Sequence, residues 1–233
     1  MQRSDVIEKE KKMYSIDSDV KFPDMSHYDI NDPGGIALYL AHCDFYPFRS
    51  VIENNKIALD AIADSYREIA RKATKINDFE TECWAMTSGT LHASRVDLLT
   101  QYSLLLTMVS LLEEAVNTLC RIYHDVYKIE KELKDIRGSG LERAAKYIKQ
   151  EVKIEEFKSG KWEYITAIRD ARNMIVHNGG RVIKEEDFIK FDKFSIGYRD
   201  EDKQIYLEYT DITKMYDAIM EFMDNSFKLI PNR

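Results

Sequence analysis

Apolar side chains recur at intervals of three and four residues over most of the chain, which is the spacing of a helix with one buried face. The first such series begins after Phe48 and runs to about Thr74. Its apolar members are Ile52, Leu59, Ile62, Tyr66 and Ile69. Ser50 and Glu53 have the S-x-x-E spacing of a capping box, so we expect this helix to begin there.

A second series predicts a longer helix, from Ser94 to about Leu133. Its members are Leu98, Leu105, Val109, Leu112, Val116, Leu119 and Tyr123. A second apolar row widens the stripe, which indicates a helix that is buried on more than one side. Residues 77–93, which precede this helix, show no clear periodicity.

Two shorter helices are predicted next. Ser139 and Glu142 repeat the capping-box spacing and predict a helix to about Glu151. Another helix is expected from about Lys161 to His177, with Trp162, Ile165, Ile168 and Ile175 on its apolar side. Asn178-Gly179-Gly180 ends it, because glycine readily adopts the left-handed conformation that closes a helix.

The last third of the chain shows a change of period. Residues 188–198 and 204–209 alternate apolar and polar positions around a charged turn, which predicts a β-hairpin over 188–209. Residues 211–229 return to helical spacing. Prolines and glycines punctuate residues 1–48, which we expect to be irregular. The expected fold is therefore mainly α: an irregular segment over 1–48, then one helical domain over 49–233 with its core in 94–180.

Composition is that of a globular protein in a reducing compartment. The apolar fraction is 44%, enough for a core. Cys43, Cys83 and Cys120 are odd in number and far apart, which favours buried free thiols. Residues 1–15 are too charged for a signal peptide, and the apolar stretch 104–112 is far shorter than the roughly 20 residues of a membrane span. We expect a soluble, cytoplasmic protein without a membrane partner.

Charge is unevenly distributed along the chain. The net charge is −7, yet residues 121–184 hold 15 Lys and Arg against 10 Asp and Glu. A basic segment can attract a polyanion, although a solvated helix surface explains the same charges. The sequence has no G-x-S-x-G, Walker or H-E-x-x-H motif. The turn Gly138-Ser139-Gly140 could present N–H groups to a phosphate, but a plain helix start is favoured.

The segment that most strongly indicates a chemical function is Arg172-Asn173-Met174-Ile175-Val176-His177. Asn173 and His177 are four residues apart and share a helix face, and Arg169 extends that row. Arg172 and His177 are five apart, or roughly 140° around an ideal helix, so one regular helix does not stack them. Either the helix loosens at its end or a second subunit supplies the partner group.

These groups suit cleavage of an RNA phosphodiester, whose 2′-OH is the nucleophile. His177 can transfer protons near neutral pH, and Arg172 can hold the negative phosphorane with its planar fork. Asn173 could orient either of them, and the reaction needs neither a metal ion nor a cofactor. The alternative is purely structural: a surface ion-pair residue, a satisfied amide and a histidine that complements the helix dipole.

The segment resembles the HEPN superfamily, whose signature is an Arg, four to six residues and a His, often with a polar residue after the Arg. Arg172-Asn173-x-x-x-His177 fits the four-residue form, and Val176-His177-Asn178-Gly179 is similar to many bacterial members. Ser110-Leu-Leu-Glu-Glu114 and Gly138-Ser-Gly-Leu-Glu-Arg143 resemble the elements that precede the motif. The resemblance covers roughly residues 94–180 and, less closely, the last helix.

The resemblance implies a homodimeric helical bundle that cuts RNA without a metal ion and leaves a 2′,3′-cyclic phosphate. Arg172, Asn173 and His177 would be catalytic, with Arg169 and Arg181 as substrate contacts. Members act in toxin–antitoxin pairs and phage defence, so an antitoxin protein is a candidate partner. Some members have no nuclease activity and act as binding modules, so the alternative is that this protein is a non-catalytic helical module that binds a partner protein or a nucleotide. One toxin subfamily carries a modified Tyr two residues after the His; here that residue is Gly179.

Overall fold

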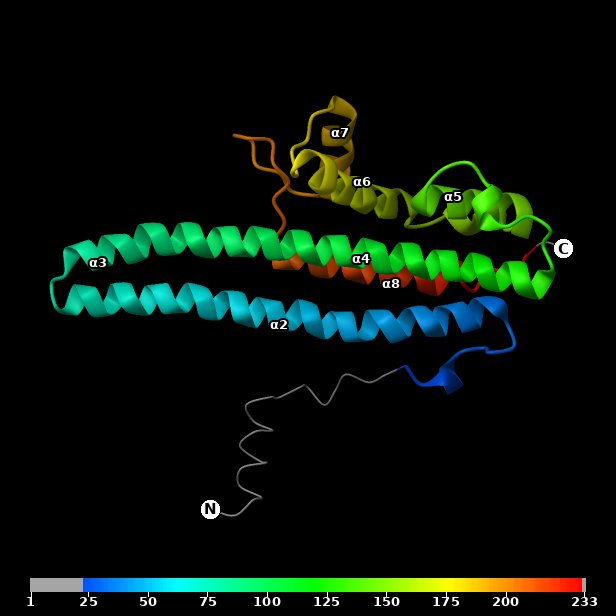
Figure 1. Cartoon of the computed structure of the whole chain (residues 1–233), viewed down its shortest axis with the longest axis horizontal. Coiled ribbons are helices and arrows are strands. Elements are labelled where there is room, and N and C mark those ends of the chain that lie inside the picture. Colours follow the sequence, from blue (N-terminus) through cyan, green and yellow to red (C-terminus); the bar gives the residue numbers. More distant parts are fainter. Residues whose placement is uncertain (1–22, 232–233) are drawn as a thin grey trace, which may run out of the picture.

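The computed structural model describes residues 23–231, and its main feature is a pair of long antiparallel helices (Figure 1). α2 spans Pro33–Lys75 and α4 spans Thr90–Tyr127. Between them, α3 (Phe79–Trp84) and the π-helical turn η2 (Ala85–Gly89) lead directly into α4. The predicted long helix is thus confirmed, but it ends at Tyr127, where Lys128 is left-handed, and not near Leu133. The ambiguous segment before it is also helical.

Shorter helices cover one end of this pair. α5 spans Gly140–Tyr147, α6 spans Trp162–Asn178 and α8 spans Tyr209–Ser226. α4 contacts α2, α5, α6 and α8, as its wide apolar stripe predicted. Its central side chains are at most 1% exposed, and they are Leu105, Met108, Val109, Leu112, Val116 and Leu119. The short helical turns are η1 (Met25–His27), η3 (Leu133–Asp135), η4 (Ile148–Val152) and η5 (Glu155–Lys158).

α2 begins sixteen residues earlier than its periodicity indicated. The Asp32 side chain accepts a hydrogen bond from the Gly35 N–H, and Pro33 occupies the first helical turn. Residues 33–48 are therefore helical, and the prediction that they are irregular is wrong; residues 1–22 lie outside the described part. Ser50 is inside the helix and does not cap it, and Glu53 pairs with Arg49 instead.

The predicted β-hairpin over 188–209 is also wrong. Glu185–Phe194 forms helix α7, and the rest of this region holds only two isolated bridges within the described residues, Arg181 with Gln204 and Tyr198 with Ile205. Phe191 is fully buried, with Phe188 and Phe194 packed at the edge of the core. Their three-residue spacing fits a helix that faces the core. The alternation of apolar and polar positions in this region therefore predicted the wrong element.

The far half of the α2–α4 pair extends beyond α6 and α8 as a two-helix stalk, residues 64–92 (Figure 1). With no third helix of the described chain over it, the stalk leaves large apolar side chains exposed: Ile76, Phe79, Trp84, Met86 and Leu91. By length and composition alone, Phe79–Tyr127 could cross a membrane. Half of its most apolar window is buried inside the protein, and the core helix of a soluble protein passes the same test.

Candidate functional site

The C-terminal end of α6 presents the candidate residues. Trp162, Ile165, Ile168 and Ala171 bury one face of the helix against the core. Gly179 closes the helix with φ +61°, as predicted, and its N–H donates to the Met174 carbonyl. The helix end is fixed further by Gly180, which is buried against Tyr102 of α4.

An open cleft of about 580 Å³ lies between the end of α6 and α7, and we call it the α6–α7 cleft. Asn173 and His177 both line it, so the two residues that share a helix face also share one wall. The other lining residues are Asp170, Met174, Asn178, Ile183, Lys184, Glu186, Asp187 and Lys190. His177 is exposed and makes no hydrogen bond or ion pair with another described residue. Its imidazole is therefore accessible to a ligand.

Arg172 is close to this wall but not part of it. Its Nη1 donates to Asn173 Oδ1 at 3.0 Å, whereas its Nε is buried without an acceptor among the described residues. The angular offset predicted for Arg172 and His177 is thus present, because α6 remains helical through both residues. Within one chain, Asn173 is the residue that connects the guanidinium to the cleft.

The two predicted substrate contacts differ in availability. The Arg169 guanidinium donates to Asp170 Oδ1 at 2.7 Å, and its Nη1 lies 3.6 Å from Glu142. Lys190 binds the other oxygen of Asp170 at 2.7 Å, which completes an ion-pair network. Arg181 is exposed, and its side chain has no hydrogen bond to another described residue. Arg181 is therefore the freer of the two cations.

The cleft is not the basic surface that the excess of Lys and Arg over 121–184 suggested. Lys184 and Lys190 line it together with three carboxylates, Asp170, Glu186 and Asp187. Burial raises the pKa of Asp187, and the negative charges of Glu186 and Asp170 raise it further. Attraction of a polyanion to this cleft from one subunit alone is accordingly weak.

Asp187 is the site residue that sequence reasoning missed. The signal for it was present, because Glu185-Glu186-Asp187 is the acidic first turn that favours a helix N-terminus. Within residues 23–231, no group of three His, Cys, Asp or Glu side chains has the arrangement of a metal site.

The chain matches no known protein-family model, no curated protein and no solved structure.

Proposed function

We propose that this protein is a homodimeric, metal-independent endoribonuclease that acts in the cytoplasm, and that residues 94–180 form a HEPN-like core. The observation that carries the proposal is the end of α6. An exposed imidazole and an amide share one cleft wall, and that amide is bound to an arginine side chain. Histidine and arginine are the groups that phosphodiester cleavage by a 2′-OH requires.

In the proposed reaction, His177 removes the proton of the 2′-OH as its oxygen attacks phosphorus. The bond from phosphorus to the 5′-oxygen breaks, and the departing oxygen takes a proton from water; the hydroxide left behind takes back the proton that His177 removed. The products are a 2′,3′-cyclic phosphate and a free 5′-OH. Arg172 stabilises the additional negative charge on the phosphorane oxygens, with its guanidinium oriented by Asn173.

A dimer would bring together Arg172 and His177, which lie on different sides of α6 within one chain. In one chain, Arg172 does not line the cleft that His177 lines. A two-fold axis near the end of α6 would bring Arg172 of one subunit toward His177 of the other, because such an interface places the same patch of both chains face to face. The exposed Arg181 would add positive charge to a cleft that has little of its own.

The direct test is cleavage of total RNA in the presence of EDTA. We expect His177→Ala to lower the rate by at least about 100-fold, which is the contribution of a general acid or base. The matched control is His124→Ala, which removes a histidine that hydrogen-bonds to Asp125 elsewhere on the molecule. Equal cleavage by wild type and His177→Ala, with both folded, would contradict the assignment.

The stalk supports a second candidate, a non-catalytic module that binds a protein partner such as an antitoxin. Ile76, Phe79 and Leu91 are each more than 70% exposed at the tip, and apolar side chains gathered in this way commonly mark protein interfaces. This function predicts that wild type cuts no RNA and that Phe79→Ser abolishes capture of its partner. The ribonuclease predicts cleavage that Phe79→Ser leaves unchanged.

A further inference from the structure

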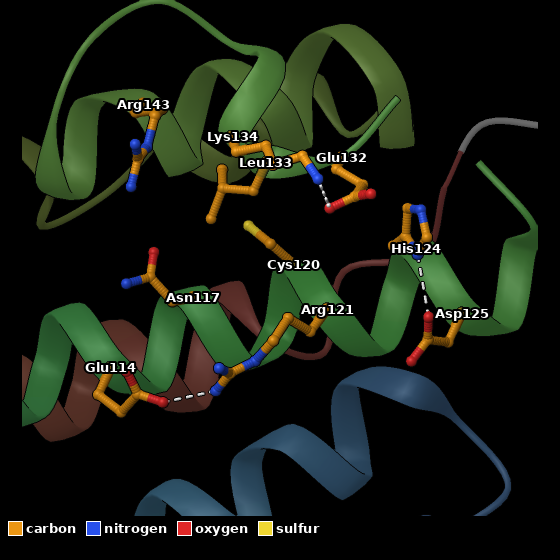
Figure 2. A pocket seen from close by; sticks show the side chains of 10 residues that line it. All are labelled: Glu114, Asn117, Cys120, Arg121, His124, Asp125, Glu132, Leu133, Lys134 and Arg143. Atoms are coloured by element: carbon orange, nitrogen blue, oxygen red, sulfur yellow. Dashed lines mark hydrogen bonds and ion pairs between the residues drawn. The ribbon is translucent and has the colours of Figure 1, made fainter. Parts of the chain in front are cut away.

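A second cleft, of about 460 Å³, lies between the C-terminal half of α4 and the segment that contains η3 and α5 (Figure 2). We call it the α4–α5 cleft. Its volume is within the range of small-ligand pockets, which run from about 300 to 1,000 Å³. Tyr102, which lies against Gly180, and Asn117, which lines this cleft, are fifteen residues apart on α4, or about 22 Å along the helix. The cleft is therefore separate from the His177 site.

The charged groups of this cleft are paired, with one exception. Glu114 accepts from Arg121, Glu132 pairs with Lys134 and Asp125 with His124. Arg143 is the only lining cation whose side chain has no hydrogen bond or ion pair with another residue of the described chain. Arg143 is therefore the lining cation that is left to pair with a ligand.

The surroundings of Arg143 hold its guanidinium at the cleft. The side chain comes down from α5 and points toward Asn117 of α4 (Figure 2). Its Nε is buried and has no acceptor within residues 23–231. The backbone of Gly138 passes beside its stem, because a Cβ on that glycine would lie 3.6 Å from Arg143 Cβ. A guanidinium that is oriented in this way is prepared to form a forked pair with an anionic group.

The floor of the cleft is apolar. Cys120 is 1% exposed, and its sulfur points toward Leu133 across the cleft (Figure 2). Burial raises the pKa of the Cys120 thiol to about 12, so it presents a neutral, weakly polar surface. The Asn117 carboxamide forms no hydrogen bond with another described residue and offers a donor and an acceptor opposite Arg143.

The nearby start of α5, by contrast, is not free for an anion. A Cβ on Gly140 would lie 2.5 Å from Glu113 Oε1, so the carboxylate of Glu113 already occupies the N-terminal end of this helix. An anion in the cleft therefore meets Arg143 rather than the helix terminus.

We propose that the α4–α5 cleft binds a small organic anion, a carboxylate or a phosphate monoester. Its charged group pairs with the Arg143 guanidinium and the Asn117 amide, and its apolar part lies against Leu133 and Cys120. This site does not depend on the proposed ribonuclease activity, since it shares no residue with the α6–α7 cleft.

The test is isothermal titration calorimetry of the full chain with phenyl phosphate, phenylacetate and the uncharged 2-phenylethanol at millimolar concentrations. We expect one of the two anions to bind and the alcohol not to bind, and the tighter anion identifies the charged group. Arg143→Gln should weaken binding at least about tenfold, while Lys134→Gln, which removes a paired lining cation, should change it less than about twofold. No heat from either anion, or equal binding by Arg143→Gln, would overturn the proposal.

Asn117→Asp provides a test in the opposite direction. This nearly isosteric change places a carboxylate opposite Arg143 and supplies from within the chain the charge that the ligand would bring. We expect a higher melting temperature and loss of anion binding. An unchanged melting temperature together with unchanged binding would contradict a role for Arg143 as the anion receptor.

Discussion

The two clefts contain similar residues in different states. Each has a histidine, an asparagine and a nearby arginine whose Nε is buried without an acceptor in the part of the chain that the structure describes. In the α4–α5 cleft, His124 is bound to Asp125, and Arg143 has no partner among the described residues. At the α6–α7 cleft, His177 has no hydrogen bond or ion pair with another described residue, and the nearby Arg172 is held by Asn173.

This difference in partners suits the α6–α7 cleft to catalysis and the α4–α5 cleft to binding. A group that moves protons must be accessible and able to change its charge, which fits His177. A group that holds a stable anion needs a fixed charge and a neighbouring apolar surface, which fits Arg143 beside Leu133. The same residue types therefore indicate different functions, and their partners rather than their identities distinguish the two clefts.

Replacing the arginine of each cleft by alanine, one at a time, should produce the largest difference between the two clefts. Arg172→Ala is expected to lower RNA cleavage by at least about 100-fold, the loss typical of removing a charge that stabilises a transition state. Arg143→Ala should leave cleavage within about twofold, since the α4–α5 cleft is remote from His177. The measurement is the initial rate on one RNA in EDTA. Similar losses from both substitutions would mean that the two clefts are coupled or that neither is catalytic.

The glycines at the end of α6 allow the α6–α7 cleft to be disturbed without changing its lining residues. Gly180 has φ +84°, and a Cβ there would lie 2.3 Å from the Tyr102 hydroxyl, which donates to the Ile205 carbonyl. We expect Gly180→Ala to lower the free energy of unfolding by about 3 kcal/mol and to reduce cleavage.

Gly179→Ala is the matched control for this change. Gly179 has a similar positive φ, but no described residue lies within 4 Å of its added Cβ. Its cost should be about 1 kcal/mol, that of the left-handed backbone alone. Urea unfolding of both variants measures the difference, and equal destabilisation would mean that the Gly180–Tyr102 contact does not fix the helix end.

Asp187→Asn should produce the smallest effect. Because the folded protein raises the pKa of Asp187, ionisation of this group costs stability as the pH rises through that pKa. We expect the asparagine variant to melt slightly higher than wild type at pH 7, with the difference disappearing below about pH 3.9, the pKa of an unperturbed aspartate.

The same change removes a negative charge from the cleft, so RNA should bind about twofold more tightly. Glu185→Gln is the control, because Glu185 lies in the same helical turn but does not line the cleft. A melting difference that grows as the pH falls would show that the sign of the Asp187 effect is wrong.

The sequence predicted the local features of the site and missed those that depend on distant packing. The helix from about Lys161 to His177 and its closure at Gly179 are confirmed, because both depend on neighbours within one or two turns. The bond between Arg172 and Asn173 depends on rotamers, and the position of Asp187 in the cleft depends on how α7 packs, neither of which periodicity encodes.

The two errors in the fold have the same origin: a local pattern fits two structures, and packing against distant residues decides between them. Asp32-Pro33 is a helix start, but Gly34 and Gly35 after it resemble a turn. Gly34 is required for a different reason, since a Cβ there would lie 1.8 Å from the Phe227 carbonyl, a contact across almost the whole chain. Similarly, residues 194–198 alternate as in a strand, whereas Phe188, Phe191 and Phe194 recur every three residues as in a helix. The core against which Phe191 packs decides between the two patterns.

The central claim is that Arg172 of one subunit acts with His177 of the other. The most direct measurement is the RNA-cleaving activity of a purified heterodimer, obtained by co-expressing Arg172→Ala and His177→Ala chains that carry different tags. A shared site leaves one of the two sites of the heterodimer intact, so we predict roughly half of wild-type activity from two inactive parents. A heterodimer as inactive as its parents, or a wild-type chain that cuts RNA as a monomer, would contradict the account.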